Sequence, residues 1–111
     1  MSEETLVVLV TAPTIEEAAQ IGCALVEERL AASANLVPGM RSIYRWQEAI
    51  HDHAEVLLII KTTAAALDRL TQRVVELHSY QTPAVVALPI VGGSTAYLHW
   101  LAMQVGSEEK L

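Results

Sequence analysis

Histidine and cysteine are the side chains of this sequence that suit a soft divalent metal ion. His51 and His53 flank Asp52, and an extended backbone would place both imidazoles on the same side. Zinc, nickel and copper accept imidazole as a ligand, although surface histidines without a metal explain the pattern as well and are the favoured interpretation. The single cysteine, Cys23, falls on the apolar stripe of an expected helix, which is typical of a small buried hydrophobe. We therefore predict that Cys23 is buried.

Sequence motifs that would indicate catalysis are absent. The chain has no G-x-S-x-G nucleophile elbow and no G-x-x-x-x-G-K-[ST] phosphate loop. Gly92 and Gly93 precede an expected helix whose N–H groups could bind an anion, and Ser94 as the cap of that helix explains these residues equally well. We therefore expect a protein that is not an enzyme.

Composition and charge narrow the class of protein further. The formal net charge is −6 and the seven Lys and Arg residues form no dense cluster, which argues against nucleic acid as a partner. A single cysteine fits a reducing cytosol, and the acidic residues after Met1 do not fit a signal peptide. No apolar run approaches the roughly 20 residues that span a bilayer, so we expect a cytoplasmic protein without a membrane partner. Hydrophobic residues make up 52% of the 111-residue chain, which favours burial of apolar surface between subunits.

The first elements that must position these side chains are a strand over 5–12 and a helix after it. Thr14 and Glu17 form a capping box at the start of this helix, which we predict to run to about Ala32. Its expected buried stripe consists of Ala18, Ala19, Gly22, Cys23, Val26 and Leu30, at spacings of three and four.

The remaining elements complete an alternating order. Strands are expected over 33–39, 40–47 and 55–62, with a hairpin tip over 48–53 and a second helix that ends near His78. A strand over 84–88, bounded by proline and expected at a sheet edge, precedes a helix from Thr95 to about Val105. The order β-α-β-β-α-β with an extra C-terminal helix predicts an α+β, ferredoxin-like sandwich. We expect one domain over residues 1–111, with residues 105–111 as a frayed tail.

Several segments, taken in order along the chain, resemble one known family. They are Val10-Thr11-Ala12-Pro13, Asn35-Leu36-Val37-Pro38-Gly39, Ser42-Ile43-Tyr44-Arg45-Trp46, Lys61-Thr62-Thr63, Tyr80-Gln81-Thr82-Pro83, Leu88-Pro89-Ile90 and Tyr97-Leu98-His99-Trp100-Leu101. In this register the chain resembles the CutA family of divalent-cation tolerance proteins over about residues 6–101. The resemblance implies a homotrimer of ferredoxin-like subunits, with an architecture shared with the PII signalling proteins and with hairpin strands that pair across subunits.

The resemblance also implies a metal site, for Cu²⁺ or another divalent cation. The ligands proposed in that family are a Cys before Thr-Ala-Pro, a His two residues before the Tyr of Tyr-Gln-Thr-Pro, and a Glu after its Pro. These positions are Val10, His78 and Ala84 here, so His78 is the one candidate metal ligand that the sequence retains. A site for a soft metal needs several converging donors, so His78 would need help from another subunit or from His99, His51 or His53.

A second set of side chains is expected near a subunit boundary on the same resemblance. It consists of Trp46, Lys61, Tyr80 and Trp100, in which a cation and aromatic faces in one cleft could hold a small anionic or planar ligand. Interface packing explains the same residues and is the favoured interpretation, because Trp and Tyr are enriched at interfaces.

Two functional hypotheses follow. The first is a non-enzymatic, CutA-like homotrimer that takes part in divalent metal tolerance, with copper as the leading metal. The alternative is a PII-like trimeric sensor that binds a small anionic ligand or a nucleotide at subunit clefts, with Lys61, Arg45 and the flanking aromatics as its features.

Overall fold

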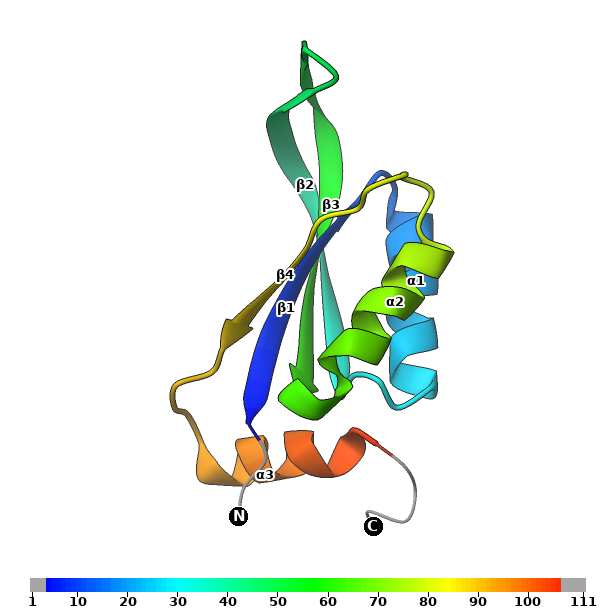
Figure 1. Ribbon diagram of the computed structural model, residues 1–111. Coiled ribbons are helices and arrows are strands. Elements are labelled where there is room, and N and C mark those ends of the chain that lie inside the picture. The colour runs from blue at the N-terminus through cyan, green and yellow to red at the C-terminus, as the bar shows by residue number, and fades with distance from the viewer. Residues whose placement is uncertain (1–3, 107–111) are drawn as a thin grey trace.

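Within residues 4–106, which the computed structural model describes, the chain forms a four-stranded antiparallel sheet with three α-helices (Figure 1). The elements in order are β1 (Thr5–Ala12), α1 (Ile15–Glu27), β2 (Ser33–Trp46), β3 (Ala49–Thr63), a 3-10 turn (Ala64–Ala66), α2 (Leu67–Leu77), β4 (Val85–Pro89) and α3 (Thr95–Gln104). The strand order is β2-β3-β1-β4, which places β4 at a sheet edge as predicted. The α+β, ferredoxin-like plan with an extra C-terminal helix is therefore confirmed.

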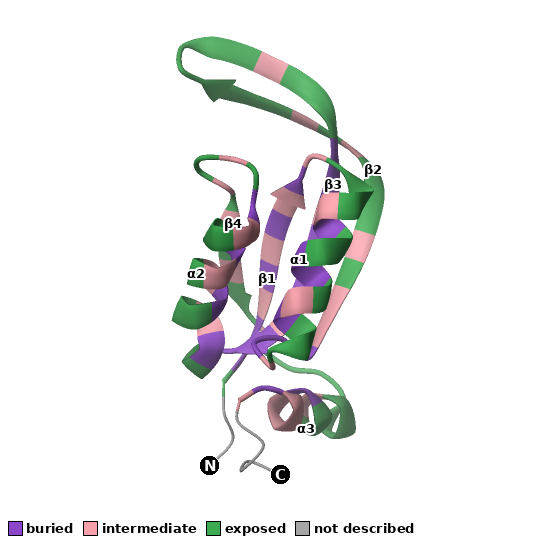
Figure 2. Cartoon of the chain, turned by 90° about the vertical axis from the view of Figure 1, so that its right-hand side faces the viewer, coloured by how far each residue is buried: buried purple, intermediate pink, exposed green. Residues whose placement is uncertain are grey.

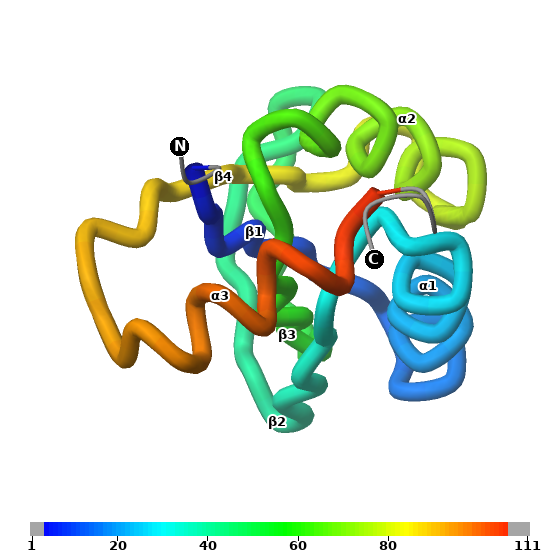
Figure 3. Tube along the Cα trace, turned by 90° about the horizontal axis from the view of Figure 1, so that it is seen from below, coloured from blue at the N-terminus to red at the C-terminus, as the bar shows by residue number. Residues whose placement is uncertain are grey.

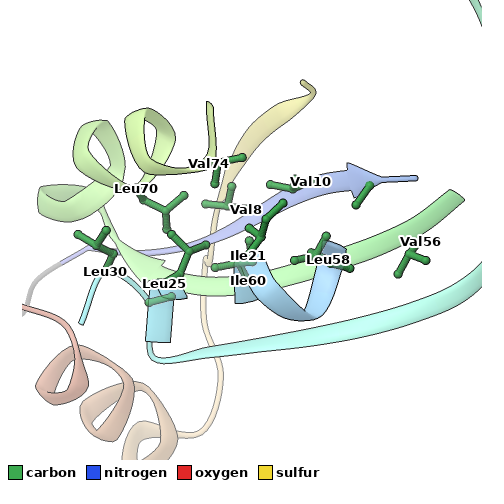
Figure 4. Close-up of a cluster of buried hydrophobic side chains, with 13 residues drawn as sticks. Val8, Val10, Ile21, Leu25, Leu30, Val56, Leu58, Ile60, Leu70 and Val74 are labelled. Carbon is green, nitrogen blue, oxygen red and sulfur yellow. The ribbon is translucent and has the colours of Figure 1, made fainter. Parts of the chain in front are cut away.

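The main core lies between the sheet and helices α1 and α2, which pack together on one face of it (Figures 1 and 4). Alternation along β1 and β3 sends every second side chain toward the helices, and the apolar stripe of α2 faces them. The fully buried side chains of this layer include Val8, Val10, Ile21, Leu25, Leu58, Ile60, Leu70 and Val74. The core is aliphatic, as a sequence without Phe requires.

Helix α1 begins as predicted but buries a different stripe. Thr14 Oγ1 accepts a hydrogen bond from the Glu17 N–H at 3.1 Å, which is the expected cap. The buried positions are Ala18, Ile21, Gly22 and Leu25, whereas Ala19, Cys23 and Val26 are exposed. The prediction that Cys23 is buried is wrong, because apolar residues lie on more than one face of the helix and do not fix which face turns inward. Figure 2 shows that α1 has both buried and exposed segments. Gly22, which belongs to both the predicted and the observed stripe, allows α1 to lie close to β2, since a Cβ there would be 3.2 Å from the Ala34 Cβ.

The end of α1 also differs from the prediction, because the helix stops at Glu27 instead of about Ala32. Arg29 adopts a left-handed conformation with φ 60°, and the Leu30 N–H donates to Leu25 O at 2.9 Å. This is a Schellman motif with arginine where glycine is usual, so the sequence shows no sign of it.

Arg29 also holds the last turn of α3 and the residues after it. Its Nε donates to Gly106 O at 2.9 Å and its Nη2 donates to Met103 O at 3.1 Å. The Gly106 N–H returns a bond to Arg29 O at 2.9 Å, and Val105 is buried at 1% exposure (Figure 3). The predicted frayed tail is therefore wrong for Val105 and Gly106, and its remaining residues, 107–111, lie outside the described part of the chain.

Strands β2 and β3 form a hairpin that extends past the rest of the sheet (Figures 1 and 2). The two strands predicted over 33–39 and 40–47 are one strand, with a register shift between Val37 and Met40 where Gly39 has φ 83°. The tip consists of Gln47 and Glu48 alone, both at positive φ, and not of the predicted 48–53. A tight turn of this kind is usually marked by Asn-Gly or Asp-Gly, so Gln-Glu gives no signal of it.

The sheet leaves apolar side chains uncovered on the face opposite α1 and α2. Ala87 of β4 pairs with Val8 and belongs to the core layer, so its neighbours on β4, Val86 and Leu88, face the other way. Val86 is 52% exposed and Leu88 is 47% exposed. Among the described residues, no helix is both long enough and apolar enough to cross a membrane.

Candidate functional site

A cleft of about 600 Å³ lies between the outer half of the hairpin and the loop that follows α2. In Figure 2 the hairpin arches over the ends of β1 and of this loop. The cleft is lined by Thr11, Ser42, Ile43, Tyr44, Trp46, Glu55, Tyr80, Gln81, Thr82 and Ala84. Its size is in the range of pockets that hold small organic molecules.

The local sequence explains how the cleft is built. The bulge at Pro38-Gly39 interrupts the register of β2, and bulges bend and twist the strand that carries them. Beyond α2, the chain crosses the end of β1 as an irregular segment that Pro83 helps to keep out of a helix. Tyr80 and Ala84 thus meet Tyr44 and Trp46 across the cleft, although they lie far apart in sequence.

Glu55 and Tyr80 form the central polar contact of the cleft. The Tyr80 hydroxyl donates to Glu55 Oε2 at 2.6 Å, and Glu55 is only 4% exposed. Burial and the hydrogen bond to Glu55 raise the pKa of Tyr80 well above its usual value. The phenol therefore stays protonated and acts as a donor to a buried carboxyl group.

His78, the candidate metal ligand, uses both ring nitrogens inside its own subunit. Nε2 lies 2.7 Å from Thr11 O and must donate to this carbonyl. Nδ1 accepts from the Tyr80 N–H at 3.0 Å and lies 3.3 Å from Glu17 Oε2. The Glu17 oxygen itself accepts from the N–H and hydroxyl of Ser79. This pattern defines a neutral imidazole with its proton on Nε2 and no free lone pair for a metal.

The other implied metal positions do not complete a site around His78. Val10 is buried in the aliphatic core, and Ala84 lines the cleft without a donor side chain. Within the described residues there is no group of three or more His, Cys, Asp or Glu side chains that could hold a metal ion. The donor set of one subunit therefore does not fit a metal site at His78.

His51 and His53 lie on β3 and not in the turn, and they share a face as an extended backbone requires. Tyr44 contacts both, since its ring stacks on His51 at 5.2 Å between centroids and its hydroxyl lies 3.0 Å from His53 Nε2. Between the histidines, Asp52 makes a two-point ion pair with Arg41, which lowers the pKa of Asp52. The histidines thus belong to an aromatic cluster beside the cleft.

The structure brings together only two of the four predicted cleft residues within one subunit. Trp46 and Tyr80 line the cleft, and Lys61 and Trp100 do not. Lys61 pairs in register with Val7 and Ser33 near the other end of β3, where its Nζ donates to Asn35 Oδ1 at 2.9 Å. Trp100 is on α3, 43% exposed and in ring contact with Tyr97.

Sequence reasoning did not single out Glu55 or Tyr44 as site residues. The one signal for Glu55 was an acidic residue directly before a run of buried strand residues, which also fits the start of an ordinary strand. Its position at the cleft depends on the bulge and on the loop that carries Tyr80, neither of which the sequence pattern locates.

The fold and this cleft define an α+β subunit of ferredoxin-like topology with a protruding hairpin. The family model "CutA1 divalent ion tolerance protein" matches residues 6–104, so the chain belongs to the CutA1 family. This confirms the resemblance found in the sequence.

Relatives and solved structures agree with this assignment. The divalent-cation tolerance protein CutA of Thermus thermophilus is 52% identical over 100 residues, which are 90% of this chain and 97% of the relative. The chloroplastic CutA of Arabidopsis thaliana is 45% identical over 87% of this chain, which spans only 53% of that longer relative. The Thermus thermophilus structure superposes with a TM-score of 0.90 at 51% identity, covering 92% of this chain and 99% of that one. CutA1 from Oryza sativa gives 0.92 at 41% identity, covering 96% and 98%.

Proposed function

We propose that this protein is a non-enzymatic, cytoplasmic homotrimer that takes part in tolerance of divalent metals, copper among them. The observation that carries the proposal is the 52% identity to a divalent-cation tolerance protein over nearly the full length of both chains. The sequence has neither a nucleophile elbow nor a phosphate loop, which supports a role other than catalysis.

The uncovered apolar surface supports the homotrimer. Val86 and Leu88 are half exposed on the face opposite the helices. Burying such residues between subunits stabilises an assembly by about 25 cal/mol for each Å² of apolar surface removed from water. Sedimentation equilibrium is expected to give three times the chain mass of 12.1 kDa. A monomer at micromolar concentration would contradict the trimer.

The metal part of the proposal is tested by titration of the purified protein with Cu²⁺ and Zn²⁺. His78 is the candidate ligand, and its use would require the ring to leave Thr11 O and to find further donors, for example on another subunit. Micromolar binding that is lost in His78→Ala and kept in His99→Ala would support a site at His78. Binding no tighter than millimolar would exclude direct metal binding by this sequence.

A PII-like sensor is the second candidate function, and the cleft is the observation that favours it. A volume of about 600 Å³ with Trp46 and Tyr80 on its walls suits a small ligand. In this hypothesis the ligand is a small anion or a nucleotide, and Lys61 is the residue that would bind its negative charge. Calorimetric titration with ATP tests it. Because Lys61 does not line the cleft of its own subunit, saturable binding that Lys61→Ala abolishes would require Lys61 of another subunit to reach the ligand. ATP binding that Lys61→Ala leaves unchanged would contradict the role of this lysine.

A further inference from the structure

The buried carboxyl group of Glu55 has no cationic partner within the described residues. Among the described residues its one hydrogen bond comes from the Tyr80 hydroxyl at 2.6 Å. The ion pairs of Arg41 and Arg73 go to other acids. A carboxylate that is 4% exposed loses most of its hydration. Removing a charge from water is costly unless an opposite charge compensates it. A cation bound in the cleft would supply the opposite charge that the described residues around Glu55 lack.

The side chains around Glu55 also favour a positively charged ligand. Tyr44, Trp46 and Tyr80 line the cleft, and the faces of aromatic rings attract cations. No Lys, Arg or His is among the lining residues, so an anion would meet Glu55 without a compensating charge. Lys61 lies six residues from Glu55 along β3, which is about 20 Å in an extended strand.

The chemistry of the cleft favours an organic cation over a metal ion. A divalent metal is usually held by about four donors from His, Cys, Asp or Glu side chains and water. The lining supplies one carboxylate, one amide (Gln81), the hydroxyls of Thr11, Ser42 and Thr82, and aromatic residues, with no His or Cys. The volume of about 600 Å³ is also far larger than a metal ion needs, and it fits a small molecule that combines a positive head with an apolar body.

We propose that this cleft binds a small organic ammonium ion, with Glu55 as its counter-ion and Tyr44, Trp46 and Tyr80 as its aromatic wall. The inference rests on the second proposed function, a ligand sensor at this cleft, and assigns the class of ligand. The ligand class that we assign to the cleft is thus cationic, in place of the anion or nucleotide expected from the sequence.

The test uses the full-length protein carrying Trp100→Phe, so that Trp46 is the remaining source of tryptophan fluorescence. Choline is the probe, and 3,3-dimethylbutan-1-ol is its uncharged counterpart of the same shape. Choline is expected to change the Trp46 emission in a saturable way and to bind at least about tenfold more tightly than the alcohol, because a desolvated cation–π contact and a counter-ion act on the charged probe alone. Equal affinity for the two probes, or no saturation by choline at 50 mM, would overturn the inference.

Variants locate the binding. Glu55→Gln keeps an oxygen that can accept from Tyr80 and removes the charge, so choline affinity is expected to fall about tenfold or more. Glu27→Gln removes the same charge from an exposed position on α1 and is expected to bind choline as the parent does. If Glu55→Gln fails to fold, Trp46→Leu with calorimetric detection serves as the second variant. Unchanged choline affinity in the folded variant overturns the assignment.

A parallel titration with ATP separates the two proposals. If ATP saturates the Trp46 signal and choline does not, the cleft is a ligand site and the cationic assignment is wrong. If neither probe binds, both the sensor function and the cationic assignment fail. If choline binds and ATP does not, the sensor function stands with the cation as its ligand class.

Discussion

Replacing Tyr80 by Phe removes one hydroxyl and leaves the ring in place, so it isolates the hydrogen bond to Glu55. The donor–acceptor distance is 2.6 Å and Glu55 is 4% exposed, so water does not readily replace the lost donor. A hydrogen bond to a charged group contributes about 1.5–3 kcal/mol, and burial of the acceptor favours the upper half of this range. We expect Tyr80→Phe to lower the free energy of unfolding by about 2–3 kcal/mol at pH 7.

The assay is urea unfolding at a fixed protein concentration, followed by circular dichroism, for the parent, Tyr80→Phe, Glu55→Gln and the double variant. In the Glu55→Gln background the same change removes only a neutral hydrogen bond, which is worth about 1 kcal/mol. The cycle is therefore expected to give a coupling energy of about 1–2 kcal/mol. A loss below about 0.5 kcal/mol, equal in both backgrounds, would refute the view that this bond stabilises a buried charge.

Three further predictions follow from other contacts. Because its folded pKa is raised, Tyr80 keeps its full contribution to stability below the unfolded value of 10.0 and loses it as the pH rises above that value. The free energy of unfolding is therefore expected to fall from pH 9 to pH 11 by less in Tyr80→Phe than in the parent. An equal fall in the two proteins would contradict this. Leu58→Ala leaves a cavity in the core and is expected to cost about 2–5 kcal/mol in urea unfolding, whereas the exposed Val86→Ala costs little in a dissociated subunit. Arg29→Ala removes the bonds to Met103 O and Gly106 O and is expected to speed hydrogen exchange in the last turn of α3, with the first turn unchanged. Uniform protection along α3 would show that Arg29 does not hold its end.

The elements whose positions could be predicted are those with a strong local signal. A β-branched run indicates the strand β1, Thr14 marks the start of α1, and an apolar stripe indicates the helix α2. The phase of α1 could not be predicted, because Ala19, Cys23 and Val26 are apolar but exposed. The end of α1 depends on a left-handed arginine, which the pattern of residue types does not mark.

The candidate site was predictable only in part. Trp46 and Tyr80 line the same cleft, as the sequence led us to expect. Lys61 was expected beside them, but it lies elsewhere on β3 and donates to Asn35. His78 has the residue type of a metal ligand, yet its two nitrogens are bonded to Thr11 O and the Tyr80 N–H. Residue type defines what a side chain could bind, and tertiary hydrogen bonds decide whether its lone pairs are free.

The contacts of Arg29 with the end of α3 have a consequence for the order of folding. They join positions 74 and 77 residues apart, whereas the hairpin of β2 and β3 closes through a two-residue turn. Closing a flexible loop becomes costlier by about 0.6 kcal/mol for each doubling of its length. The hairpin is therefore expected to form early, and the junction between Arg29 and Gly106 among the last contacts, so that protection of the Gly106 amide reports a completely folded subunit.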